Sequence, residues 1–182
     1  GGPGAGSPTP LGHEVAGLVH ETGPEVEGLA PGTEVIVQNH VSCGLCEACL
    51  NGRNRFCRNI RTYMNDRAGL AEYLTVDRRM VVPYRGLGFL SAALAEPLTV
   101  ALDVVREAEI EPGQRVCVSG PGIIGLFCAM LARLSGAGHI LVLDEFPSMV
   151  GASPELPAVI QKFVDRQHES PRHVIIAGSS QR

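Results

Sequence analysis

Short apolar runs separated by turn residues occupy the first half of the chain, from Glu14 to about Val82. Runs of this length, bounded by glycine, proline and polar residues, predict β-strands rather than helices. A Pro31-Gly32 turn marks the start of one of them, and Pro83 ends the last. The expected strands cover residues 15–20, 33–37, 71–76 and 80–82.

The pattern changes to helical spacing at Gly86 and stays helical to Glu109. Pro97 interrupts this stretch, so either a new helix starts there or the helix is kinked. Beyond Pro112-Gly113 an apolar strand, an amphipathic helix and a second apolar strand follow, which is typical of a parallel sheet covered on both faces. These elements are expected at residues 116–118, 122–134 and 140–143, with a further helix at 156–167 and a strand at 174–178.

The composition excludes several classes of partner. The 182 residues are 45% hydrophobic and 19% charged, with a net charge of −4 and no block of Lys or Arg. This argues against nucleic acid and against anionic lipid. Residues 1–10 lack the features of a signal peptide, and the longest uncharged run, Val116–Ala132, is broken by Gly120-Pro121-Gly122. We therefore expect a cytoplasmic protein that spans no membrane.

Four of the six cysteines are clustered in the order C-x2-C-x2-C-x7-C. Four thiolates this close together can surround one tetrahedral Zn²⁺, as structural zinc sites do. An iron–sulfur cluster also takes four cysteines, but the usual run has a shorter last spacing and a following proline. Disulfides or free thiols are the other alternative, which suits a secreted protein better. The expected zinc ligands are Cys43, Cys46, Cys49 and Cys57, whereas Cys117 and Cys128 lie in apolar elements and are expected to be core residues.

A glycine-rich turn, G-x-G-x-x-G, directly follows the strand expected at 116–118 and opens the next helix. In this position it predicts a dinucleotide site, with the pyrophosphate at the helix N-terminus. Asp144 ends the next strand, where an acid binds the adenosine ribose and repels a 2′-phosphate, so NAD is favoured over NADP. The alternative is a βαβ unit whose glycines serve only packing. The expected cofactor-binding residues are Gly120, Gly122, Ile123, Ile124, Gly125 and Asp144.

Two further acidic motifs are weak when taken alone. Gly12-His13-Glu14 reads as a polar pair at the start of a strand. Glu96-Pro97 reads as a carboxylate at a helix N-terminus, where the helix dipole favours it. Neither shows metal-ligand spacing by itself.

Taken in chain order, these motifs resemble the medium-chain zinc-containing alcohol dehydrogenases. The resemblance runs from about Leu11 to Asp144. The most similar branch is that of the sorbitol-type polyol and threonine dehydrogenases, whose members carry Glu-Pro-Leu where classical alcohol dehydrogenases carry a cysteine. The motifs that carry the resemblance are Gly12-His13-Glu14, the four-cysteine run, Gly69-x-Ala71-Glu72-Tyr73, Ala95-Glu96-Pro97-Leu98 and the glycine turn with its acid.

The resemblance implies an α/β protein with two parts: a GroES-like β-barrel portion over residues 1–88, with a zinc lobe at about 41–60, and a partial Rossmann domain over 89–182. It also implies that His13 and Glu14 are ligands or near-ligands of a catalytic zinc. Glu96 would be a further carboxylate that approaches the metal directly or through water. The implied activity is oxidation of a small secondary alcohol, polyol or threonine-like substrate by NAD, and the full-length form is expected to be a homo-oligomer.

The sequence departs from the family pattern in several places. The cysteine ligand that family members carry upstream of the Gly-His-Glu motif has no counterpart here, and the second half of the Rossmann sheet is missing. The helix expected directly after Asp144 is replaced by Glu145-Phe146-Pro147-Ser148-Met149, and the family's Pro-Gly-Asp turn reads Pro31-Gly32-Thr33. We therefore expect a fragment that does not turn over by itself. The alternative is a non-catalytic zinc-binding module derived from the family.

Overall fold

The computed structural model describes residues 11–63, 68–144, 153–155, 157–159, 162 and 174–177. The chain divides into two units, Gly1–Glu96 and Pro97–Arg182. Among the described helices, none has both the length and the apolar character that crossing a membrane would require.

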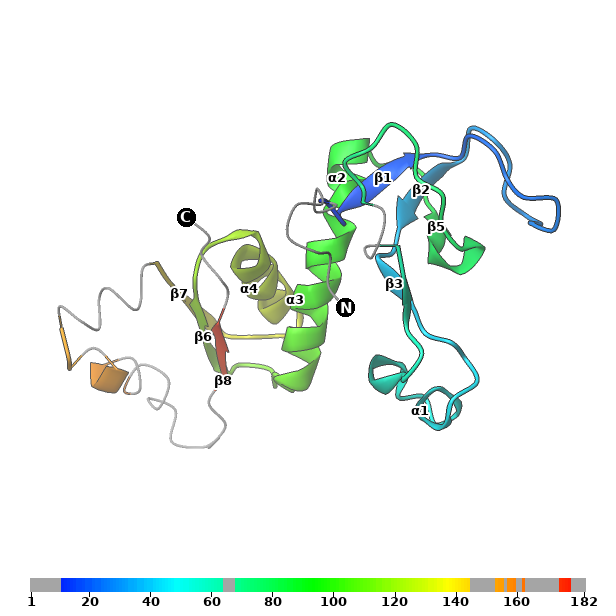
Figure 1. Cartoon of the computed structure of the whole chain (residues 1–182). Helices are drawn as coiled ribbons and strands as arrows, with labels where there is room; N and C mark the ends of the chain where they lie inside the picture. Colours follow the sequence, from blue (N-terminus) through cyan, green and yellow to red (C-terminus); the bar gives the residue numbers. More distant parts are fainter. Residues whose placement is uncertain are drawn as a thin grey trace, which may run out of the picture. The chain divides into compact units, whose positions relative to one another are not determined.

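An antiparallel sheet of three strands forms the centre of the first unit, in the order β1-β2-β5 (Figure 1). β1 (Val15–Leu18), β2 (Glu34–Val37) and β5 (Val81–Pro83) confirm three of the predicted strands, each with somewhat different ends. Val35 and Val37 of β2 are buried, as alternation along a half-buried strand requires. The short helix α2 (Phe89–Ala93) packs against β1.

A second, two-stranded ladder carries the cysteine loop. β3 (His40–Val41) pairs antiparallel with β4 (Arg61–Thr62), and the chain between them contains α1 (Glu47–Leu50) and the 3₁₀ turn η1 (Asn54–Phe56). In Figure 1 this hairpin extends from the sheet to the end that carries α1.

The strand predicted over residues 71–76 is wrong. This segment has no strand conformation, although Leu74 and Val76 pack against the buried cluster of Val37, Tyr63 and Met80. The alternation that predicted a strand therefore reflects side-chain burial without a hydrogen-bonded ladder. In the strand order β1 is an edge strand among the described residues, and a cavity of about 800 Å³ is lined by β1 and by this segment. Met80, predicted as the start of the last strand, lies in the 3₁₀ turn η2 (Arg78–Met80).

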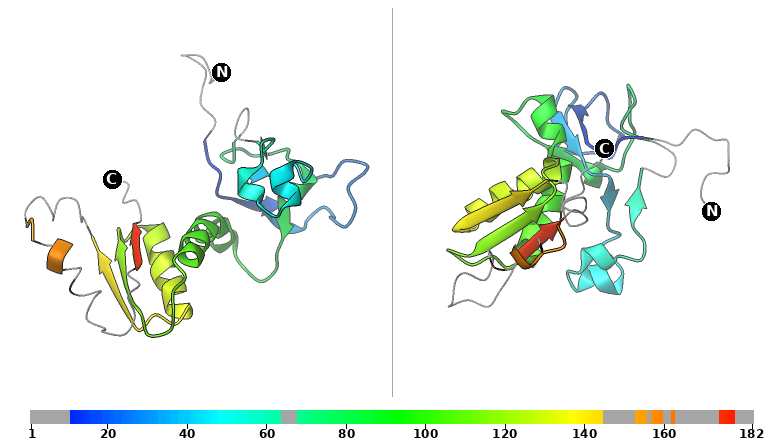
Figure 2. Two further views of the ribbon diagram at one scale, coloured as in Figure 1. Left: turned by 90° about the horizontal axis from the view of Figure 1, so that it is seen from below. Right: turned by 90° about the vertical axis from the view of Figure 1, so that its left-hand side faces the viewer.

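The second unit is built on a parallel sheet with the order β7-β6-β8. β6 (Arg115–Ser119), α4 (Ile123–Leu134) and β7 (His139–Leu143) form the predicted strand–helix–strand unit, and β8 (Val174–Ala177) confirms the last predicted strand. α4 contacts all three strands (Figure 2).

The core of this unit contains Ala101, Val105, Val116, Val118, Cys128, Ala132 and Ala137. The helix predicted over 86–109 is two helices, α2 and α3 (Ala95–Glu107). Pro97 lies in the first turn of α3, where its missing N–H costs nothing. The helix predicted at 156–167 falls mostly outside the described residues, as do 145–149.

Candidate metal and dinucleotide sites

The four clustered cysteines meet at one point of the β3–β4 hairpin. Their sulfur atoms lie within 4.8 Å of one another. The Sγ–Sγ distances are 3.5 Å for Cys46–Cys49, 3.9 Å for Cys46–Cys57 and 4.0 Å for Cys43–Cys49. Four sulfurs bound tetrahedrally to one Zn²⁺ at about 2.3 Å would be about 3.8 Å apart. A disulfide needs about 2.05 Å and a multi-iron cluster needs wider spacing, so the geometry fits a single ion.

Backbone N–H groups point at the sulfurs and favour the thiolate form. Cys43 Sγ accepts from the N–H groups of Leu45 (3.5 Å) and Cys46 (3.4 Å), and these bonds lower the pKa of Cys43. The pKa of Cys46 is lowered to about 6 by the N–H groups of Cys49 and Arg58. Burial and the neighbouring Cys46 thiol raise the pKa of Cys49 to about 11. A thiolate is the form that binds a metal ion. The low pKa values of Cys43 and Cys46 therefore favour metal binding, whereas Cys49 must lose its proton when a metal ion binds.

The cysteine loop depends on a left-handed backbone at two positions. Gly44 has φ +76° and Gly52 has φ +71°. A Cβ at either position would meet no atom within 4 Å, so the backbone conformation rather than crowding favours glycine there.

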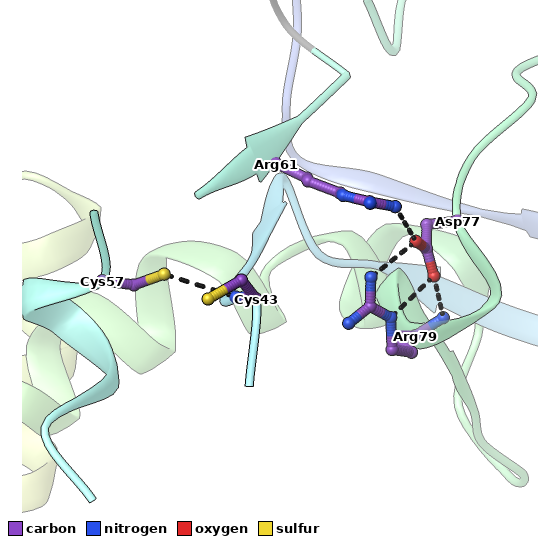
Figure 3. Close-up of polar contacts among 5 residues, drawn as sticks. All are labelled: Cys43, Cys57, Arg61, Asp77 and Arg79. Carbon is purple, nitrogen blue, oxygen red and sulfur yellow. Dashed lines mark hydrogen bonds and ion pairs between the residues drawn. The ribbon is translucent and has the colours of Figure 1, made fainter. Parts of the chain in front are cut away.

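A carboxylate joins the base of the hairpin to the 3₁₀ turn η2, which follows the hairpin in the chain (Figure 3). Asp77 accepts from Nε (3.1 Å) and NH2 (2.9 Å) of Arg79, and Arg61 NH1 of β4 lies 3.5 Å from the same carboxylate. These interactions, led by the Arg79 side chain, lower the pKa of Asp77 to about 2. Asp77 also caps η2 by accepting from the Arg79 backbone N–H.

A second cluster brings Glu96 to His13 and Glu14, which lie far from it in the sequence. His13 and Glu14 immediately precede β1, whereas Glu96 is in the first turn of α3. One possible ligand atom from each lies within 4.8 Å of the others. His13 Nε2 is 3.8 Å from Glu96 Oε1, wider than the roughly 3.4 Å between nitrogen and oxygen ligands on a tetrahedral zinc ion. One histidine and two carboxylates suit a metal site that keeps a position open.

Two neighbours of this cluster were not predicted from the sequence. Asn39 Nδ2 lies 3.5 Å from Glu96 Oε1, and its Oδ1 is hydrogen-bonded to Nδ1 of His40. The Tyr63 hydroxyl donates to the backbone carbonyl of His13 at 3.4 Å. Burial, and secondarily the charge of Glu96, raise the pKa of Tyr63. No local motif marks either residue, because their partners are distant in sequence.

The glycine turn follows β6 and opens α4. Gly120 has φ +94°, and its N–H donates to the carbonyl of Leu143 at 2.7 Å. Gly122 is the N-cap residue of α4 and has no side chain to block the helix N-terminus. A Cβ at Gly125 would lie 1.8 Å from the carbonyl oxygen of Gly120, so helix and turn approach as closely as the backbone allows.

The residues after the two strands lie at the same edge of the sheet. Ser119 pairs with Leu143, which places Gly120 and Asp144 next to each other at the carboxyl ends of β6 and β7. Asp144 is exposed there. Ile123 and Ile124 form the first turn of α4, with Ile123 44% exposed. In parallel sheets this edge, with a helix N-terminus beside it, is where dinucleotides bind.

Residues 2–86 match the family model of the alcohol dehydrogenase GroES-like domain. Among curated proteins, L-galactonate-5-dehydrogenase of Escherichia coli (strain K12) is 36% identical over 154 residues, 82% of this chain and 45% of that protein. L-threonine 3-dehydrogenase of Pyrococcus abyssi is 39% identical over 139 residues, 75% of this chain and 40% of that protein. The chain thus spans less than half the length of these two relatives.

Among solved structures, one described as a zinc-binding dehydrogenase from Sinorhizobium meliloti 1021 bound to NADP matches with a TM-score of 0.69. It is 38% identical, and the match covers 74% of this chain and 40% of that one. The domain match, the relatives and this fold agree with the resemblance seen in the motifs. Over residues 2–86 the chain belongs to the alcohol dehydrogenase GroES-like domain family, and over most of its length it is similar to zinc-binding dehydrogenases of the medium-chain type.

Proposed function

We propose that this chain carries the zinc and coenzyme sites of a dehydrogenase that transfers a hydride between a secondary alcohol and NAD. The observation that carries the proposal is the convergence of His13, Glu14 and Glu96 on one point of the first unit. The proposed substrate is a secondary alcohol or polyol, or a threonine-like compound, since relatives are named sorbitol dehydrogenase and L-threonine 3-dehydrogenase.

His13, Glu14 and Glu96 are proposed to hold a catalytic zinc ion. When bound, zinc polarises the substrate oxygen and lowers the pKa of the alcohol. Three protein donors leave a position for that oxygen. Cys43, Cys46, Cys49 and Cys57 are proposed to hold a second, structural zinc ion, because four thiolates close the coordination shell.

Gly120, Gly122 and Gly125, with Ile123 and Ile124, are proposed to receive the coenzyme pyrophosphate at the N-terminus of α4. Asp144 would accept hydrogen bonds from the adenosine ribose. Its carboxylate would repel the 2′-phosphate of NADP, so we propose NAD as the preferred coenzyme.

The remaining assignments belong to the same proposal. Residues 1–88 are assigned to the GroES-like domain and 89–182 to the Rossmann domain. The full-length form is proposed to be a cytoplasmic homo-oligomer without nucleic-acid or membrane partners.

The compactness of the cysteine cluster favours a second candidate, a zinc-binding module without turnover. Its Sγ–Sγ distances of 3.5, 3.9 and 4.0 Å fit a tetrahedral metal ion better than the 3.8 Å between His13 Nε2 and Glu96 Oε1 does. Such a module would keep its structural zinc whether or not the second cluster binds a metal ion.

Zinc content and hydride transfer separate the two candidates. The purified chain is analysed for zinc, titrated with NADH, and assayed for NAD reduction with sorbitol, L-threonine and simple secondary alcohols, alongside any longer form from the same gene. The dehydrogenase requires two zinc ions per chain, NADH binding and activity in the longest form. One zinc ion per chain and no activity in any form would instead support the second candidate, the zinc-binding module.

A further inference from the structure

We infer that the β3–β4 hairpin links the two candidate metal sites, with Asn39 and Tyr63 as the residues that position Glu96 and His13. The inference rests on the proposed metal site at His13, Glu14 and Glu96. The two residues directly flank the paired ends of the hairpin whose far end carries the cysteines.

Asn39 has only one amide orientation that satisfies both neighbours. A carboxylate can only accept hydrogen bonds, so the NH₂ group must face Glu96 and the carbonyl oxygen must face His40. His40 must then donate from Nδ1. The amide therefore holds one oxygen of Glu96 on the side of His13, whose Nε2 faces that same oxygen.

The backbone of Asn39 is fixed in turn by β4. Thr62 Oγ1 donates to the carbonyl of Asn39 at 2.7 Å, and Thr62 pairs with His40 across the ladder. On the preceding side, the N–H of Gln38 donates to the carbonyl of Met80 at 2.7 Å. Hydrogen bonds at Asn39 and at the residue before it therefore fix the backbone from which the Asn39 side chain contacts Glu96.

Tyr63, the residue directly after β4, acts on the other partner, His13. Its ring is 4% exposed and packs with Val37 and Met80, so its hydroxyl is aimed at the carbonyl of His13 by a fixed ring. Asn39 and Tyr63 are separated in sequence by the whole cysteine loop. Their spacing depends on how β3 and β4 are held together, which closure of that loop around a metal ion would set.

The test is the zinc affinity of each site in the full 182-residue chain, measured by competition with a chelator. Co²⁺ absorption distinguishes the sites, because only the thiolate site gives sulfur-to-metal charge-transfer bands. Asn39→Ala is expected to weaken the second site about tenfold and to change its Co²⁺ ligand-field bands. The thiolate site should be unchanged.

Matched variants separate positioning from general damage. Asn59→Ala, an exposed asparagine in the same loop, should leave both affinities unchanged. Asn39→Gln keeps the amide and should retain more affinity than Asn39→Ala. Tyr63→Phe should give a smaller loss than Asn39→Ala, and the exposed Tyr73→Phe should give none.

The link itself is tested by removing the thiolate site with Cys46→Ser and Cys49→Ser. Affinity at the second site should fall, and Asn39→Ala should then have less than its full effect, because both changes break one connection. Unchanged affinity in Asn39→Ala, or fully additive losses, would overturn the inference while leaving the proposed function in place. A wild-type chain that binds no second metal ion would remove both.

Discussion

The carbonyl oxygen of Gly120 lies where a side chain at position 125 would begin, 1.8 Å from the ideal Cβ position of Gly125. The contact is between backbone atoms of the turn and the helix, so no flexible side chain can move aside. Gly120 itself is held by its φ of +94° and by its hydrogen bond to Leu143.

Gly125→Ala should therefore destabilise the second unit by about 1–3 kcal/mol, the usual cost of overpacking. It should also weaken NADH binding, because the turn must shift. Urea unfolding followed by circular dichroism and a fluorescence titration measure the two effects. Gly23→Ala, at a loop position where a Cβ meets nothing within 4 Å, is the control and should change stability by no more than about 0.5 kcal/mol.

Asp144 should determine the choice of coenzyme. Asp144→Ser removes the charged acceptor for the ribose, and a hydrogen bond to a charged group contributes about 1.5–3 kcal/mol. NADH affinity should fall at least about tenfold, while NADPH affinity should rise because the repulsion is gone. Parallel titrations with both coenzymes check this, and equal losses for both would contradict the role of Asp144.

Loss of a single thiolate should empty the cysteine site. Cys46→Ser replaces the thiol whose pKa is lowered to about 6 by a hydroxyl that does not ionise, so zinc content should drop by one ion per chain. Residues 43–57 should become sensitive to protease. Cys128→Ala is the control, because the Cys128 side chain is fully buried in the second unit. The zinc content of this variant should match that of the wild type.

Asp77 should add stability that disappears in acid. Its pKa in the folded chain is about 2, below the roughly 3.9 of an unfolded aspartate. The added stability is therefore complete above about pH 4 and is lost as the pH falls toward 2. Because the side chain is 24% exposed, we expect about 1 kcal/mol or less.

Comparing wild type with Asp77→Asn isolates this carboxylate, since both retain an oxygen that can cap η2. The difference in unfolding free energy should shrink between pH 4 and pH 2. Asp103→Asn on the exposed face of α3 should show no such trend, and a pH-independent difference for Asp77→Asn would contradict the assignment.

Much of the fold could be predicted because local signals and tertiary structure agree. The strand–helix–strand pattern around Gly120 and the apolar runs of β1, β2 and β5 each fit one element. The strand predicted over residues 71–76 was wrong because a period of two also arises when an irregular segment buries alternate side chains, here Leu74 and Val76. The roles predicted for the metal and coenzyme residues stay predictions until the tests above are made. Asn39 and Tyr63 could not be found, since Glu96 and His13 are remote from them in the sequence.

The chain enters the cysteine loop at His40 and leaves it at Thr62, and these two residues are paired. Because the loop starts and ends at one pair of hydrogen-bonded residues, its length and sequence can differ without altering the path of the strands of the sheet. A short β-turn grafted between them would preserve the topology of the sheet. In such a graft the turn alone would fix the separation of the entry and exit points, and that separation would no longer depend on metal binding in the cysteine loop.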